Sequence, residues 1–147
     1  MNIGLVPATA ANVGEYVRVM RAVSSRINLG ITDPREALDH IEVVTSKKIT
    51  ADGELAGFVD YYPKGPDHVY IDQFAILPGF QGKGIGSFVL DTLLDQFKVS
   101  GMKKASLVTH PENEALRLYQ RKGFVVIDSV DNFEGSGEPR LVLELVL

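Results

Sequence analysis

A chain of 147 residues, of which 45% are apolar and 23% charged, has the size and balance of a globular protein, and we expect one domain over residues 1–147. It contains no cysteine, which excludes a disulfide, a thiolate zinc site and a cysteine nucleophile. The formal net charge is −4 and no run of five or more Lys and Arg occurs, so non-specific nucleic-acid binding, which relies on clustered cations, is disfavoured.

The first third of the chain predicts a short strand and two helices. Residues 3–6 form a strand that Pro7 ends, and Thr9 is placed to cap the helix that follows. The apolar residues of that helix recur at helical spacing: Val13, Tyr16, Val17, Met20 and Val23. The run Asp33-Pro34-Arg35-Glu36 then has the side-chain cap, the proline and the glutamate of a second helix start. We expect this helix to bury Ala37, Ile41 and Val44.

The middle of the chain changes to a period of two and then returns to a helical period. Residues 48–51 and 55–62 flank the turn Asp52-Gly53 and predict a hairpin, which a strand at 69–77 follows. The clearest helix of the chain begins after Gly82 and ends at Gly101. A broad apolar stripe runs along it: Ile85, Phe88, Val89, Leu93, Leu94 and Phe97.

The last third predicts three strands and one short helix. The strands are at 105–109, 124–127 and 141–147, the helix is at 114–121, and a polar loop spans 131–139. Strands thus gather in the middle and at the end of the chain, with helices between them. We therefore predict an α+β fold with a mostly antiparallel sheet.

A glycine-rich segment from Phe74 to Ser87 joins a predicted strand to the clearest helix. Glycines let the backbone turn and approach a ligand closely. The first N–H groups of a helix have no partner within the helix, and together with the helix dipole they form an anion site. Lys83 adds a mobile cation beside it. The segment therefore predicts a phosphate-binding loop.

Two familiar phosphate-binding patterns do not fit this loop. The Walker pattern fails because Gly79 and Gly82 are too close together and Gly84 follows Lys83 where a hydroxyl residue is needed. The dinucleotide pattern fails because Ser87 stands in place of its last glycine. A plain turn without a ligand is disfavoured, since four glycines in eight residues carry an entropy cost that such a turn need not bear.

The pattern Gln81-x-x-Gly84-x-Gly86, after a strand and Pro78, resembles the diphosphate loop of the GNAT superfamily of N-acetyltransferases. The resemblance implies a mixed, mostly antiparallel sheet of six or seven strands flanked by about four helices, and acetyl-CoA as the acetyl donor. It also implies these donor-binding residues: Phe74, Ala75, Ile76, Gln81, Gly82, Lys83, Gly84, Ile85, Gly86 and Ser87. The backbone N–H of Ile76 is then a candidate for polarising the thioester carbonyl oxygen.

A second block agrees with the resemblance. Its Ala-x-x-x-Tyr-x-x-x-Gly-Phe core is matched in register by Ala115, Tyr119, Gly123 and Phe124. The resemblance implies that Tyr119 contacts the donor and protonates or hydrogen-bonds the departing sulfur, which suits a phenol of pKa ~10 that stays protonated at neutral pH. The family's CoA-contacting asparagine commonly lies one residue upstream, where this chain has Glu112. We therefore expect Asn113 to serve through a shifted turn.

Acetylation of an amine also needs a base, because deprotonating an alkyl ammonium of pKa ~10.4 costs ~4–5 kcal/mol at pH 7. The resemblance places Asp72 where some related enzymes carry an acidic base; the alternative is a solvated or ion-paired side chain. His110, at a predicted strand end, is the rival base. Asp60, Tyr61 and Tyr62 on the neighbouring strand either line an acceptor cleft or stabilise a half-buried strand.

We therefore predict an enzyme that moves an acetyl group from acetyl-CoA directly to a primary amine of a small molecule or peptide, without an acyl-enzyme and without a metal. The alternative is a catalytically silent CoA-binding regulatory or interaction module. Residues 1–7 lack the features of a signal peptide, and no stretch approaches the ~20 apolar residues of a membrane span. We expect a cytoplasmic protein without nucleic-acid or membrane partners. The apolar strand at 141–147 favours a homodimer if it lies at a sheet edge; a central position is the alternative.

Overall fold

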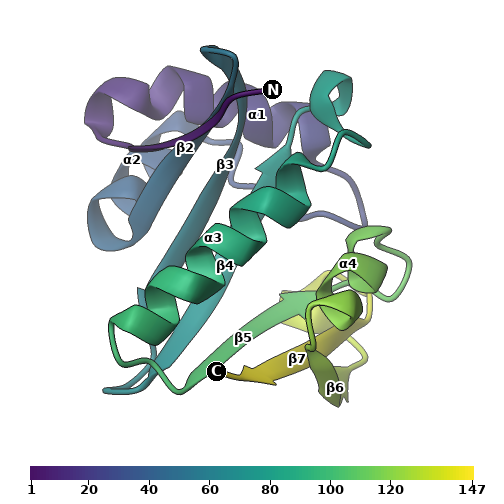
Figure 1. The fold of residues 1–147 in the computed structure, drawn as a ribbon. Helices are drawn as coiled ribbons and strands as arrows, with labels where there is room; N and C mark the ends of the chain where they lie inside the picture. Colours follow the sequence, from purple (N-terminus) through teal and green to yellow (C-terminus); the bar gives the residue numbers. More distant parts are fainter.

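The computed structural model describes all residues from 1 to 147 and contains one seven-stranded sheet (Figure 1). The strands are β1 (Ile3–Pro7), β2 (Thr45–Ala51), β3 (Glu54–Pro63), β4 (His68–Ile76), β5 (Lys104–Thr109), β6 (Val125–Val130) and β7 (Arg140–Val146). Their order across the sheet is β1-β2-β3-β4-β5-β7-β6, and only β4 and β5 run parallel. The predicted mixed, mostly antiparallel sheet is confirmed.

Four α-helices cover the two faces of this sheet, as predicted. They are α1 (Val13–Val23), α2 (Pro34–Val43), α3 (Ile85–Val99) and α4 (Ala115–Arg121). In Figure 1, α3 and α4 lie in front of the sheet, and α1 and α2 lie on the other side. The predicted starts of the first two helices are also present: the Thr9 side chain caps a 3₁₀ turn that leads into α1, and Asp33 caps α2 with Pro34 at its first position.

The structure moves several predicted boundaries. Strand β2 begins at Thr45 rather than at residue 48, and Val44, expected inside α2, follows the helix as its C-cap. Strand β7 begins at Arg140, one residue before the predicted start. It lies between β5 and β6, so the apolar last strand is paired on both sides and β6 forms this edge of the sheet. None of the helices combines the length and the apolar character that a membrane-spanning segment requires.

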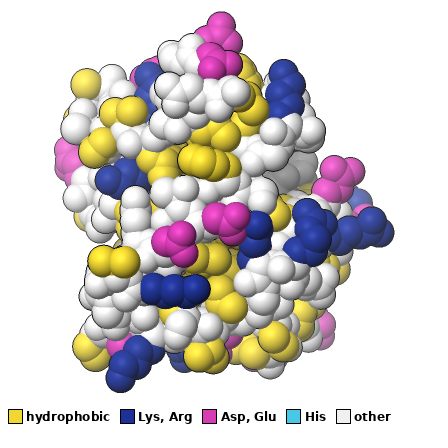
Figure 2. Space-filling model, in the orientation of Figure 1, with side chains coloured by type: hydrophobic (Ala, Val, Ile, Leu, Met, Phe, Trp, Pro, Cys, Tyr) yellow, Lys and Arg dark blue, Asp and Glu magenta, His cyan; other side chains and the backbone are white.

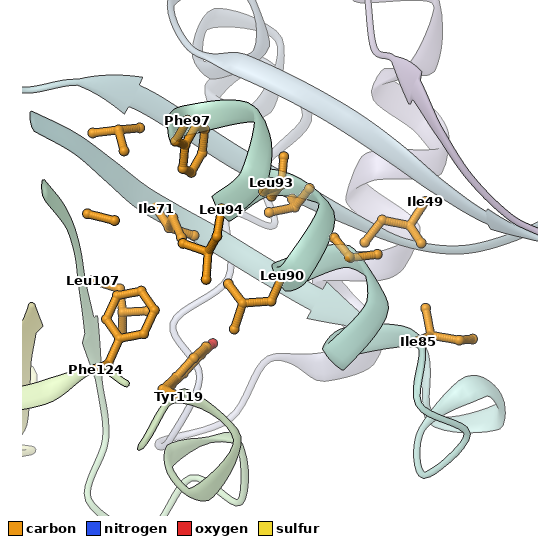
Figure 3. Close-up of a cluster of buried hydrophobic side chains, with 14 of the residues drawn as sticks. Ile49, Ile71, Ile85, Leu90, Leu93, Leu94, Phe97, Leu107, Tyr119 and Phe124 are labelled. Carbon is orange, nitrogen blue, oxygen red and sulfur yellow. The ribbon is translucent and has the colours of Figure 1, made fainter. Parts of the chain in front are cut away.

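Two hydrophobic clusters hold the layers together. The larger one fills the space between the sheet and the helices α3 and α4, and Figure 3 shows Leu90 and Leu94 of α3 facing Ile71 of β4. The smaller one lies on the opposite face and joins α1 and α2 to the sheet through Tyr16 and Phe58. Burial of large apolar side chains on both faces makes the sheet the rigid middle layer from which the loops project.

The sheet opens between β4 and β5. These strands pair only along His68–Tyr70 and Lys104–Ser106, and in Figure 1 they diverge beyond that point. Strand β4 also bulges, because two of its residues, Asp72 and Gln73, lie opposite the single residue Asp60 of β3. Bulges bend a strand and redirect its side chains, and they recur beside active sites. The divergence and the bulge together place a cleft at the middle of the sheet.

Candidate active site

The cleft between the diverging strands has a volume of about 910 Å³. Its walls come from the segment 23–30 after α1, from β4, from the loop that leads into α3, from the end of β5, from α4 and from the start of β7. On the face that carries α3 and α4, acidic, basic and hydrophobic side chains are interspersed and no single charge dominates (Figure 2). An anion that binds on this face therefore depends on local donors rather than on a charged patch.

The predicted phosphate loop supplies such donors from its backbone. Gly82 and Gly84 have positive φ angles of 75° and 82°, and α3 begins directly after Gly84. No side chain caps this helix, and the backbone N–H groups of residues 82–87 donate to no acceptor in the protein. The Gln81 amide donates to the carbonyl oxygen of Ile76 at 2.8 Å and ties the loop to the end of β4. Unpartnered N–H groups at a helix start are the physical basis of an anion site.

Nine of the ten predicted donor-loop residues line the cleft: Phe74, Ala75, Ile76, Gln81, Gly82, Gly84, Ile85, Gly86 and Ser87. Lys83 does not. Its Nζ atom lies 5.7 Å from the centroid of the Phe80 ring, outside the cleft wall. The side chain is long and mobile, but in this position it adds no cation to the backbone donors.

Tyr119 reaches the cleft from α4. Its side chain is only 7% exposed and stands edge-on to Phe124 in the main hydrophobic cluster. In Figure 3 its hydroxyl points from α4 toward α3. Burial raises the pKa of Tyr119 to about 12, so the phenol is fully protonated at neutral pH and acts as a hydrogen-bond donor. Thr109 also lines the cleft, and its buried hydroxyl has no partner in the protein.

Asn113 lines the cleft as predicted, but both ends of its side-chain amide are engaged. The Oδ1 atom accepts from the backbone N–H of Ala115 at 2.9 Å, at the start of α4. The Nδ2 group donates to Oδ1 of Asn28 at 3.2 Å. Asn113 thus connects the α4 wall to the loop after α1, a role that the sequence did not indicate.

Asp72 lies in the β4 bulge, faces the α1–α2 side of the sheet and lines the cleft with 26% of its side chain exposed. Burial raises the pKa of Asp72, the negative charges of Asp60 and Glu134 act in the same direction, and His40 opposes them. A carboxylate with a raised pKa is a better proton acceptor than an ordinary aspartate. Of the two predicted bases, Asp72 has both the position and the electrostatics for the task.

His110, the other predicted base, has no free ring nitrogen that could accept a proton. It is buried, its Nδ1 accepts from the backbone N–H of Glu112 at 3.0 Å, and its Nε2 lies 2.9 Å from a carboxylate oxygen of Glu138. With Nδ1 acting as an acceptor, the proton sits on Nε2 and points at Glu138, so the ring has no free lone pair. His110, Glu112 and Glu138 also place ligand atoms within 4.8 Å of one another, but Arg26 already contacts both carboxylates at 2.9 Å.

A buried polar cluster behind Asp72 was not predicted. Asp60 is completely buried and accepts hydrogen bonds from Ser46, at 2.6 Å, and from the Tyr16 hydroxyl. His40 of α2 places Nε2 2.9 Å from Asp60 and 3.5 Å from Asp72. Burial disfavours the charged form of His40, yet the hydrogen bond and charge of Asp60, with Asp72, raise its pKa above 6.5. His40 follows the buried Ala37 by one helical turn, so its place on the inner face of α2 was readable.

Of Asp60, Tyr61 and Tyr62, the three residues considered for an acceptor cleft, only Tyr62 lines the cleft. Its ring lies beside that of Tyr70, at a centroid distance of 5.3 Å. Tyr61 points to the opposite face and packs edge-on against Phe97, and Asp60 is enclosed in the cluster described above. Phe133, Glu134 and Arg140 are among the cleft residues that the sequence did not place there. Glu134 has a φ angle of +50°, a strained conformation for a residue other than glycine.

Comparison with known proteins gives consistent matches. The model of the acetyltransferase (GNAT) family matches residues 28–124. L-2,4-diaminobutyric acid acetyltransferase from Nocardia farcinica is 35% identical over 66 residues, which are 44% of this chain and 34% of that protein. [Ribosomal protein bS18]-alanine N-acetyltransferase from Haemophilus influenzae is 34% identical over 67 residues, 46% of each protein. The matches thus span less than half of these two relatives.

A solved structure extends the likeness to the whole fold. The crystal structure of a GNAT family acetyltransferase from Elizabethkingia anophelis with acetyl-CoA bound superposes with a TM-score of 0.78 and covers 99% of both chains at 23% identity. At this identity the match establishes the fold, and the chemistry has to be argued from the cleft itself.

Proposed function

Because this chain belongs to the GNAT family of acetyltransferases, we propose that it transfers an acetyl group from acetyl-CoA directly to a primary amine of a small molecule or peptide. The observation that carries the proposal is the meeting of two features in one cleft: the unpartnered N–H groups before α3, and the buried phenol of Tyr119. The two relatives from Nocardia farcinica and Haemophilus influenzae are an acetyltransferase and an N-acetyltransferase by name.

The residues present fit acetyl-CoA. The N–H groups of residues 82–87 suit the diphosphate, because a helix start stabilises negative charge without a side-chain cation. The polar pantetheine arm offers hydrogen-bond partners to the orphaned hydroxyl of Thr109 and to the backbone of β4 where it has left β5. When bound, acetyl-CoA supplies an activated acyl group and a good leaving group.

Asp72 is the proposed base. It accepts a proton from the acceptor ammonium and leaves the nitrogen neutral for attack on the acyl carbon. Its raised pKa narrows the gap to the ammonium pKa of ~10.4 and so reduces the cost of this transfer. The cleft meets the α1–α2 side of the sheet at this carboxylate, so the acceptor approaches from the side opposite to α3.

Tyr119 is the proposed partner of the departing sulfur. With its pKa at about 12 and a thiol pKa of ~8.5, complete proton transfer from the phenol to the thiolate is uphill by roughly 5 kcal/mol. Tyr119 therefore stabilises the sulfur by donating a hydrogen bond and retains its proton. Such a donor, pre-positioned by packing against Phe124, requires no reorganisation during the reaction.

An acceptor screen tests the proposal. Free CoA release is measured with acetyl-CoA and small amines, polyamines, amino acids and peptide N-termini. We expect turnover with at least one class, reduced about 10- to 100-fold in Tyr119→Phe with an unchanged CoA dissociation constant. Tyr61→Phe, which alters a tyrosine outside the cleft, is the matched control and should retain full rate. CoA binding without turnover of any amine would instead favour the catalytically silent binding module.

A further inference from the structure

Arg140 is a buried cation that has no anionic partner. Its side chain is at the start of β7, is only 4% exposed, and lies against the ring of Phe133. Its guanidinium donates to two backbone carbonyl oxygens, at 2.8 Å to Pro139 and at 3.3 Å to Arg26, and no carboxylate oxygen lies within 4.0 Å. Arg26 is the opposite case: it is 57% exposed and contacts two carboxylates.

This arrangement is energetically unusual. A buried charge is normally paired, because removal from water is costly and only an opposite charge or a full set of hydrogen bonds compensates it. A guanidinium has five N–H donors in a fixed plane, and two carbonyl bonds leave donors over. Burial accordingly lowers the pKa of Arg140, although Glu138 and Glu134 act in the opposite direction. The planar fork of a guanidinium matches a carboxylate, which accepts two parallel hydrogen bonds from it.

Arg140 belongs to the acceptor end of the cleft. Leu141 and Leu143 of the same strand join the cluster below α3 and α4, so by the alternation of a strand Arg140 faces the α1–α2 side, as Asp72 does. Both residues line the cleft. The charge of Glu134 acts on both of them, which is a second sign that they share one region.

We propose that Arg140 binds a carboxylate of the acceptor, and that the acceptor is therefore a small amino acid with a free carboxylate. The amine of this zwitterion lies toward Asp72 and its carboxylate toward Arg140, so each end meets a group of opposite charge. The aromatic rings of Tyr62, Tyr70 and Phe133 line the same end of the cleft and suit an aliphatic chain between the two ends. This inference rests on the proposed acetyl transfer and adds the class of acceptor to it.

Matched acceptors test the inference on the unmodified protein. Rates of CoA release are compared for lysine, lysinamide and cadaverine, and for alanine, alaninamide and a peptide with N-terminal alanine. For whichever free amino acid is used, we expect kcat/KM to be at least 10-fold higher than for its amide and than for the third acceptor of its series, cadaverine or the peptide, because a site built for a polar group discriminates strongly against its absence. Equal rates within a series, or a preference for the amide or the peptide, would overturn the inference. Absence of turnover with every amine would instead count against the proposed function.

Substitution of the arginine provides the second test. In Arg140→Gln the preference for the free carboxylate should fall by 10- to 100-fold, mainly through KM, with the rate on the amide little changed. Arg140→Lys should recover part of it, since a lysine keeps the charge and loses the fork. Arg26→Gln, which removes a neighbouring arginine outside the cleft, should retain the preference.

One outcome would overturn the assignment. If Arg140→Gln is folded by circular dichroism but its rates on the free amino acid and on the amide fall equally, Arg140 only supports the loop structurally and does not bind the carboxylate. If Arg140→Gln does not fold, the matched acceptors on the unmodified protein still decide.

Discussion

The two halves of the cleft are built in different ways. The proposed diphosphate site of the donor half is one segment, from Phe74 to Ser87, and its donors are backbone groups positioned by glycines and by a helix start. The proposed acceptor half combines side chains from separate elements: Asp72 of β4 and Arg140 of β7 line the cleft, and His40 of α2 lies behind Asp72. The proposed function accounts for this difference, because a diphosphate that is the same in every reaction can be held by backbone groups. A particular acceptor has to be selected by side chains.

The halves also differ in electrostatics. The loop before α3 has no titratable side chain facing the cleft, since Lys83 lies outside the wall. The acceptor half contains a half-buried carboxylate, Asp72, and an unpaired guanidinium, Arg140, with the half-buried His40 behind Asp72, and the pKa values of all three are displaced. We therefore expect donor binding to depend little on pH and acceptor turnover to depend on it strongly. Each of the following substitutions tests one side of this contrast.

The largest effect is expected at Asp72. Asp72→Asn removes the proton acceptor and keeps the shape, so kcat/KM for the acceptor should fall by roughly 100- to 10,000-fold, the usual contribution of a general base. The CoA dissociation constant, measured by calorimetry, should change by less than about twofold, because the donor half is untouched. Asp131→Asn alters an exposed loop acid and serves as the control. An Asp72→Asn enzyme with near-normal rate would place the base elsewhere and weaken the division between the halves.

This contrast also explains what the sequence predicted well. Nine of the ten residues predicted for the phosphate loop line the cleft, and they could be found because four glycines, the strand before them and the amphipathic helix after them are all local features. The helix caps at Thr9 and Asp33 were likewise read from adjacent residues. Local backbone chemistry needs no knowledge of the fold, and the strand and helix order followed from it with errors of a few residues.

Few residues of the acceptor half could be predicted from the sequence, because their positions depend on contacts between distant parts of the chain. Asp60 looked like a candidate for the cleft wall, but which face of β3 it occupies depends on pairing with β2 and β4, which sequence periodicity alone does not fix at a bulge. Arg140 fell between the predicted loop at 131–139 and the predicted strand at 141–147, and its guanidinium contacts the backbone of Arg26, 114 residues away. Contacts of such separation leave no local signal. His40 was not predicted either, although a local signal existed: it lies one helical turn after Ala37, on the inner face of α2.

A smaller effect is expected in the donor half, at Gly84. Its φ of +82° is unfavourable for a residue with a Cβ by about 1–2 kcal/mol, although an added Cβ would meet no atom within 4 Å. Gly84→Ala should therefore lower the free energy of unfolding by about that amount. Relaxation of the loop should also weaken CoA binding by up to roughly tenfold, which corresponds to 1.4 kcal/mol. Acceptor selectivity, in contrast, should stay the same.

Gly79→Ala is the matched control for this substitution. Gly79 lies in the same loop, has equal space for a Cβ and does not have a positive φ. We expect its unfolding free energy and its CoA affinity to remain near those of the parent protein. If both alanine variants bound CoA equally well in calorimetry, the backbone geometry at the start of α3 would not determine donor affinity.

The smallest effect on rate, and the most specific one, is expected at His40. Four groups face its imidazole: Tyr16 from α1, Asp60 from β3, Asp72 from β4 and Glu36 from α2. The pKa of His40 is raised in the folded protein, so its contribution to stability is complete below pH ~6.5 and is lost as the pH rises through the folded value. Thermal denaturation should therefore occur at a lower temperature above this range, and His40→Gln should flatten the dependence.

The same substitution acts on catalysis through Asp72. The positive charge of His40 opposes the rise in the pKa of Asp72, so its removal raises that pKa further. Since the ionised carboxylate is the proposed base, the acid limb of the kcat/KM profile of His40→Gln should move to higher pH, while the rate on the alkaline plateau stays within a few-fold of the parent. His68→Gln is the control: His68 bonds Ser106 outside the cleft, and its pKa is lowered by burial and by Lys104 and Lys64. A profile that moved equally in both variants, or in neither, would show that His40 only packs against Asp72 and does not set its ionisation.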